Sequence, residues 1–114
     1  MRHDVTSIEG TGATDAVFTA LADAHRRLLL DRLRTGEATL AQLCEGLPMS
    51  RQAVSKHLAL LQSAGLVSVR SAGRHRIHAL NPVPLSNVSG WLADYERLWE
   101  DALGRLAWHI TENP

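Results

Sequence analysis

Apolar side chains recur at intervals of three and four positions in five segments of the chain, a spacing that places them on one face of a helix. The first such helix is expected after the capping residues Thr14 and Asp15. The second covers AHRRLLLDRLRTG, with Gly36 as its stop signal, and its arginines are interspersed with acidic residues as on an ordinary solvated face. The preceding residues 1–13 are aperiodic and rich in Gly and Thr, which predicts a flexible N-terminal arm.

The third and fourth segments predict two short helices joined by a tight turn. Thr39 can cap the helix LAQLCEGL, and Pro48 ends it because proline lacks the amide hydrogen that a helix interior requires. Ser50 can then cap a helix that begins with SRQAVSKHLALL, runs to about Ala64 and stops at Gly65. The apolar residues expected to pack the two helices together are Leu40, Leu43 and Leu47, and Val54, Leu58 and Leu61. Such a pair is a helix-turn-helix candidate.

In LVSVRSAGRHRIHALNP, which is rich in Val and Ile, apolar and polar residues alternate and the helical spacing ends. This pattern predicts a β-hairpin with strands near residues 66–70 and 75–80 and a turn over residues 71–74. The order of helices and hairpin is that of a winged helix-turn-helix, a mainly α fold with a small β-hairpin wing. We expect one such domain over residues 14–112.

The last apolar segment begins at Pro84 and predicts a long helix. Its apolar positions step by three and four residues in alternation, which is the spacing of the narrow seam through which two helices pair. We therefore expect the chain to dimerise through its terminal helices. The residues expected in this contact are Phe18, Leu85, Val88, Trp91, Leu92, Tyr95, Trp99 and Leu106. The aromatic members can alternatively line a small-molecule pocket, but dimer core is favoured because large aromatics dominate interface burial.

The length of 114 residues allows one domain with a modest core. No apolar run approaches the roughly 18 residues needed to span a bilayer, and the N-terminal residues lack the apolar core of a secretion signal. The single cysteine, Cys44, excludes an internal disulfide and suits a reducing cytoplasm, where we expect the protein to reside. No catalytic arrangement of side chains and no phosphate-binding glycine loop stands out, so we expect neither an enzyme nor a cofactor.

Charge is unevenly distributed along a chain whose formal net charge is zero. All 12 acidic residues lie before Gly46 or after Ala93, and the 48 residues from Gly46 to Ala93 carry a charge of +5. A neutral protein with a purely basic middle segment presents one cationic face, as a polyanion-binding protein does.

The predicted helix after Ser50 carries side chains that can read DNA. Arg51 and Ser55 lie one turn apart, as do Gln52 and Lys56, so the four project from one face. In the major groove Arg can bind guanine and Gln can bind adenine, each through two hydrogen bonds, whereas Lys and Ser can contact bases or phosphates. The Ser50 cap leaves the first amides of the helix pointing outward, where the helix dipole favours a phosphate.

The predicted hairpin adds Arg70, Arg74 and Arg76 at or beside its tip. Arg74 can reach a phosphate or enter the minor groove, where basic side chains read width more than sequence. Both elements together predict a partner that is double-stranded DNA.

Three stretches of the sequence resemble the ArsR/SmtB family of bacterial transcriptional repressors: LADAHRRLLLDRL, LAQLCEGLPMSRQAVSKHLALLQSAGLV, and the wing GRHRIHAL followed by NP. The resemblance implies a homodimeric repressor whose paired recognition helices enter successive major grooves of a palindromic DNA operator. It also implies that His57 lies beside the DNA backbone; the alternative is a histidine satisfied inside the fold.

Many members of the resembled family sense metal ions, but this chain departs from their ligand patterns. Thr39 and Ala41 stand where one family site has paired cysteines. A soft-metal site needs several thiolates, which one cysteine does not supply. Cys44 is expected to be a buried structural residue, with a thiol redox switch as the minority alternative.

The other family site lies on the last helix, where Asp94 is followed by Glu96 in the place of a histidine. His109 and Glu112 have the spacing of the partner ligands, but they lie farther from Asp94 than in metal sensors. His75 and His78 face opposite sides of a strand. We therefore predict no metal site. Two alternatives stay open: a metal- or small-molecule-responsive sensor that uses the last helix, and a winged-helix protein-interaction module that does not contact DNA.

Overall fold

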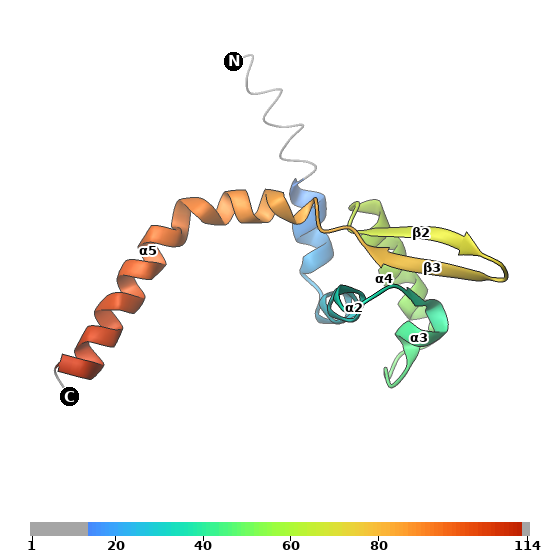
Figure 1. Cartoon of the computed structure of the whole chain (residues 1–114), viewed down its shortest axis with the longest axis horizontal. Coiled ribbons are helices and arrows are strands. Elements are labelled where there is room, and N and C mark those ends of the chain that lie inside the picture. Colours follow the sequence, from blue (N-terminus) through green and yellow to red (C-terminus); the bar gives the residue numbers. More distant parts are fainter. Residues whose placement is uncertain (1–13, 113–114) are drawn as a thin grey trace, which may run out of the picture.

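The computed structural model describes residues 14–112 of the chain (Figure 1). A helix over residues 14–21 is followed by α2, Ala24–Arg34; β1, Ala38–Thr39; α3, Leu40–Cys44; α4, Arg51–Ser63; β2, Val67–Ala72; β3, His75–Leu80; and α5, Leu85–Glu112. This order confirms the winged helix-turn-helix fold, mainly α with a small antiparallel sheet. The arm predicted over residues 1–13 lies outside the described residues. None of the described helices is both long enough and apolar enough to cross a membrane.

The hydrophobic core lies where α2, α3 and α4 meet the beginning of the hairpin. Leu29 of α2, Leu43 of α3, and Val54 and Leu61 of α4 are at most 1% exposed, and Leu66 just ahead of β2 is fully buried. The apolar face predicted for α4 is therefore confirmed, and the opposite face of α4 is left to solvent.

Thr39 belongs to two elements at once. Its hydroxyl accepts a hydrogen bond from the Gln42 amide at 3.2 Å, and the Gln42 side chain accepts one from the Thr39 amide at 2.8 Å, so a capping box begins α3. Its backbone also completes β1, which pairs with β3 and places Thr39 opposite Ile77. This third strand was not predicted, because two residues carry no alternation of their own. Helix α3 ends at Cys44 rather than at the predicted Leu47.

The wing is the hairpin of β2 and β3, with strand order β1-β3-β2 in the sheet. The strands stay paired as far as Ala72 opposite His75, so the turn is tighter than the predicted one and consists of Gly73 and Arg74. Gly73 has a φ of +62°, a left-handed conformation that glycine adopts without strain.

The solvated face predicted for the arginines of α2 is wrong for Arg26 and Arg32, which are half-buried, whereas Arg27 is exposed as predicted. Arg26 donates to the carbonyls of Ala20 and Thr19 at 2.8 and 2.9 Å, and Arg27 donates to a third carbonyl of the same helix, residues 14–21, at 2.7 Å. Arg32 donates to the carbonyls of Leu43 and Glu45 at the end of α3. The last carbonyls of a helix lack intrahelical partners and carry partial negative charge, so they attract guanidinium groups.

Helix α5 leaves the body of the molecule after its first turns (Figure 1). Leu85 and Val88 pack against the core, and Phe18 meets Trp91 edge-on with ring centroids 5.7 Å apart. Farther along, the large apolar side chains of the helix are exposed to solvent. They are Tyr95, Leu98, Trp99, Leu103, Leu106, Trp108 and Ile110. The described chain thus leaves four of the eight residues predicted to pair exposed: Trp91, Tyr95, Trp99 and Leu106.

Candidate nucleic-acid interface

The N-terminus of α4 has the cap and the exposed polar face that the sequence predicted. The Ser50 hydroxyl accepts a hydrogen bond from the Ala53 amide at 3.0 Å. Side chains of Arg51, Gln52, Ser55 and Lys56 are exposed to solvent. Because the opposite face of the helix is buried in the core, this polar face has a fixed orientation. The four side chains are therefore held ready for an external partner.

A cleft of ≈ 400 Å³ separates this part of α4 from the wing. Arg51 and Ser55 line it from α4, and Arg74 and Arg76 line it from the turn and β3. Among the described residues that line the cleft, none is acidic. The predicted recognition helix and the predicted wing therefore contribute to one cationic surface.

Arg70 differs from the other wing arginines. Its Nη2 lies 2.7 Å from Oε1 of Glu37, which precedes β1, and both side chains are more than half exposed. An exposed pair of this kind contributes about 0–1 kcal/mol to stability. It nevertheless places a carboxylate beside the basic wing, although the sequence segment that forms the wing contains no acid.

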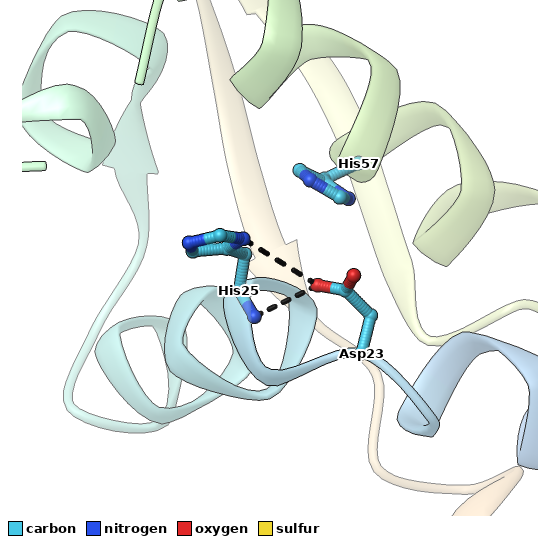
Figure 2. A group of neighbouring side chains, drawn as sticks. All are labelled: Asp23, His25 and His57. Carbon is cyan, nitrogen blue, oxygen red and sulfur yellow. Dashed lines mark hydrogen bonds and ion pairs between the residues drawn. The ribbon is translucent and has the colours of Figure 1, made fainter. Parts of the chain in front are cut away.

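His57 lies on a different side of α4 from the cleft. Its Nδ1 is 3.3 Å from Nη1 of Arg26, and its ring centroid is 5.7 Å from that of His25. Figure 2 shows its imidazole beside the start of α2. This position matches the alternative of a histidine held within the fold, and its contact with DNA stays a prediction.

Asp23 caps α2 in the same region. Its Oδ1 accepts hydrogen bonds from the backbone amides of His25 at 2.8 Å and Arg26 at 3.1 Å. These bonds, that of Arg26 foremost, hold the pKa of Asp23 below its ordinary value, so the carboxylate is ionised at neutral pH. Asp23, His25 and His57 each offer one metal-ligand atom, and the three atoms lie within 4.8 Å of one another.

The candidate sensing residues of the sequence lie on α3, β3 and α5. Cys44 packs against the core, as predicted for a structural cysteine, but it is half-buried rather than buried. His75 is exposed and His78 is buried, so the two do face opposite sides of the strand. Asp94 and Glu96 are exposed on α5. The Asp23 group was missed because its third member, His57, is distant in sequence and joins the others only in the fold.

Known proteins resemble both the sequence and the structure. A family model described as a helix-turn-helix domain matches residues 21–70. The HTH-type transcriptional regulator Rv2034 of Mycobacterium tuberculosis is 40% identical over 89 residues, which are 78% of this chain and 80% of that protein. The transcriptional repressor SdpR of Bacillus subtilis is 30% identical over 79 residues, or 69% and 88% of the two chains. A solved ArsR-like transcriptional regulator from Rhodococcus sp. RHA1 has a TM-score of 0.69 at 29% identity, covering 93% of this chain and 99% of its own.

Proposed function

Since the chain belongs to the ArsR/SmtB family of winged helix-turn-helix transcriptional regulators, which bind DNA, we propose that it is a homodimeric repressor of a palindromic operator. The observation that carries this proposal is the cleft that Arg51 shares with Arg74 and Arg76. None of the described residues that line this cleft is acidic. Guanidinium groups gathered in this way attract the DNA backbone over a distance and neutralise its phosphates on contact.

The two sides of the cleft have different roles in the proposal. Arg51 and Gln52 stand in the first turn of α4, where they reach base edges in the major groove, and Ser55 and Lys56 follow one turn later. Arg74, at the tip of the wing, reaches the backbone or the adjacent minor groove. The first pair gives sequence preference, and the wing gives affinity that is largely independent of sequence.

The homodimer is supported by the uncovered apolar face of α5. Trp99 is 41% exposed and Leu106 is 57% exposed, and these residues repeat with the seam spacing predicted from the sequence. Contiguous exposure of large apolar side chains marks an interaction surface. Pairing of α5 with the same helix of a second copy covers this face and presents two α4 helices to DNA. Half-sites about 34–36 Å apart are expected for such a dimer.

The proposal is tested with a DNA duplex taken from upstream of the protein's own gene, using fluorescence anisotropy at several salt concentrations. Each phosphate contact contributes about −0.9 to the slope of log K against log salt. Arg74→Ala is expected to flatten the slope by about one unit, and Arg97→Ala on α5 is the matched control that leaves it unchanged. An unaltered slope in Arg74→Ala removes the wing from DNA binding.

Sequence reading is tested separately with Gln52→Ala. This variant is expected to lose discrimination between the operator and a scrambled duplex, by about 1–3 kcal/mol for a lost bidentate base contact, and to keep its nonspecific affinity. A loss confined to nonspecific affinity contradicts base reading by Gln52. If the wild-type chain retards no duplex at low salt, the proposal fails, and a winged-helix protein-interaction module is favoured instead.

A further inference from the structure

Asp23, His25 and His57 converge between the start of α2 and the middle of α4 (Figure 2). A carboxylate oxygen and one nitrogen from each imidazole lie within 4.8 Å of one another. On α4, His57 stands about 200° around the helix axis from Ser55, so this cluster faces away from the DNA-binding cleft. It also shares no residue with the two metal sites of the resembled family, which fall at Thr39 and Ala41 and on α5 in this chain.

The three side chains can close around an ion with small movements. Nδ1 of His25 already lies 3.8 Å from Oδ1 of Asp23, and the side chain of His25 is 49% exposed, so it is free to rotate. Ligands bonded to a tetrahedral ion at about 2.0–2.1 Å are separated by roughly 3.3 Å. The second carboxylate oxygen of Asp23 accepts no hydrogen bond from any described residue, which leaves it available to an ion.

The surroundings select the kind of ion. The guanidinium of Arg26 lies beside His57, and the N-terminus of α2 carries partial positive charge. Both repel a cation, so only an ion that binds its ligands strongly can occupy the site. Calcium and magnesium ions prefer oxygen ligands, and this cluster offers one carboxylate. Two imidazoles with a carboxylate suit zinc, nickel, cobalt or copper ions, with water at the open position.

Metal binding at this cluster changes the contact between Arg26 and His57. In the structure Nη1 of Arg26 is 3.3 Å from Nδ1 of His57, and guanidinium can only donate, so Nδ1 is the acceptor. If Nδ1 binds the ion, its lone pair is no longer available to Arg26. If Nε2 binds the ion, the neutral ring carries its proton on Nδ1, which cannot accept. Either way, the hydrogen bond must break.

Arg26 keeps its other anchors when that bond breaks. Its Nε and Nη2 donate to the carbonyls of Ala20 and Thr19, which end the helix of residues 14–21. The guanidinium is therefore held in place while His57 turns toward Asp23 and His25. Because His57 is part of α4, the exchange acts directly on the helix that carries Arg51 and Gln52.

We propose that Asp23, His25 and His57 form a binding site for a transition-metal ion of the zinc type, which fastens the recognition helix α4 to the start of α2. The binding site stands on its own geometry. Its effect on operator affinity rests, in addition, on the proposed function.

Binding is tested without DNA, by titrating the whole chain with Zn²⁺ in a calorimeter and with Co²⁺ by visible absorption. One ion per chain is expected. His25→Ala and Asp23→Asn should each weaken affinity at least tenfold, since loss of even a group that hydrogen-bonds a ligand weakens metal affinity by about 10–100-fold. Asparagine can still cap α2, so the Asp23 variant removes the ligand charge and keeps the helix start. His75→Ala, on the exposed wing, is the matched control and should bind as the wild type does.

Two results overturn the site: wild-type affinity in both His25→Ala and Asp23→Asn, or no binding to the wild type up to about 1 mM ion. The His25 variant is decisive because its imidazole is outside the core, and an unchanged thermal unfolding midpoint shows that the variant folds. A further titration measures operator affinity with and without Zn²⁺. A change of about 5–150-fold in the wild type, absent from His25→Ala, supports regulation. An equal change in the wild type and in His25→Ala overturns regulation by this site. Failure of the chain to bind any DNA contradicts only the proposed function.

Discussion

Arg70 and Glu37 form an ion pair with 2.7 Å between Nη2 and Oε1, and this pair joins the wing to the residue just ahead of β1. Glu37 lies outside the segment of the sequence that lacks acidic residues, yet in the fold it stands beside the wing. Acidic and basic residues that are separated along the sequence are therefore not fully separated in the folded chain. Of the three wing arginines, Arg70 is the one whose charge is already partly compensated.

Replacing Glu37 with Gln is expected to strengthen DNA binding, because Arg70 is then free to contact a phosphate. The slope of log K against log salt should steepen by up to about 0.9. Glu100→Gln removes the same charge from exposed α5 and controls for net charge alone. Equal effects of the two substitutions would mean that the ion pair does not restrain Arg70.

Leu61 and Leu60 are neighbours on α4 with opposite environments, which allows a test of the core. Leu61 is fully buried and Leu60 is 49% exposed. Leu61→Ala should lower the free energy of unfolding by about 2–5 kcal/mol, as truncation of a buried leucine does. Leu60→Ala should change it by no more than about 0.5 kcal/mol. The measurement is urea denaturation followed by circular dichroism, and similar midpoints for the two variants would contradict the observed orientation of α4.

Stability is expected to decrease in mild acid because of His78. Burial lowers the pKa of this imidazole below its usual value of 6.5; the nearby backbone of Ala38 partly offsets this effect, and Arg76 lowers the pKa further. The unfolded chain therefore takes up the proton first. The contribution of the neutral His78 ring to the free energy of unfolding is fully present above pH 6.5. It is lost as the pH falls toward the pKa of His78 in the folded state.

Urea denaturation across this pH range checks the prediction. His78→Gln should reduce the dependence on pH, whereas His75→Gln, on the exposed part of the same strand, serves as the control and should retain it. If the free energy of unfolding of the wild type is constant from neutral to mildly acidic pH, the pKa of His78 is the same in the folded and the unfolded chain, and the prediction is wrong.

A charge in the exposed face of α5 should prevent the proposed dimer. Trp99→Glu places a carboxylate in a surface that must become dry on pairing, and burial of an unpaired charge is strongly unfavourable. Gel filtration is expected to show a monomer, with operator affinity reduced because two linked half-sites bind more tightly than one. Arg97→Glu, two positions away on the same helix, is the control. A wild-type chain that elutes as a monomer would itself refute the dimer.

Local signals predicted α4 well. The Ser50 cap, the apolar spacing of Val54, Leu58 and Leu61, and the stop at Gly65 are all contained in one stretch of sequence, and the observed helix ends within a residue or two of the prediction. The wing was predicted for the same reason, since strand alternation and a glycine turn are adjacent in the chain.

Contacts between distant segments were not predictable in this way. The arginines of α2 have the sequence spacing of a solvated face, and only the fold brings them to the carbonyl ends of neighbouring helices. Asp23 and His25 are two residues apart, a visible signal, but nothing local places His57 beside them. The pairing of Ala38 with His78 is likewise a product of the assembled sheet.

Thr39 begins α3 with its side chain and closes the sheet with its backbone, opposite Ile77. A tilt of the wing relative to the helix-turn-helix would have to break the β1 pairing or uncap α3. Thr39 therefore couples the wing to the helix-turn-helix through one residue. In the proposed dimer, operator affinity then depends on the distance between the two winged helix-turn-helix units, and a movement of a few ångströms between the subunits would shift both recognition helices relative to the helical repeat of DNA.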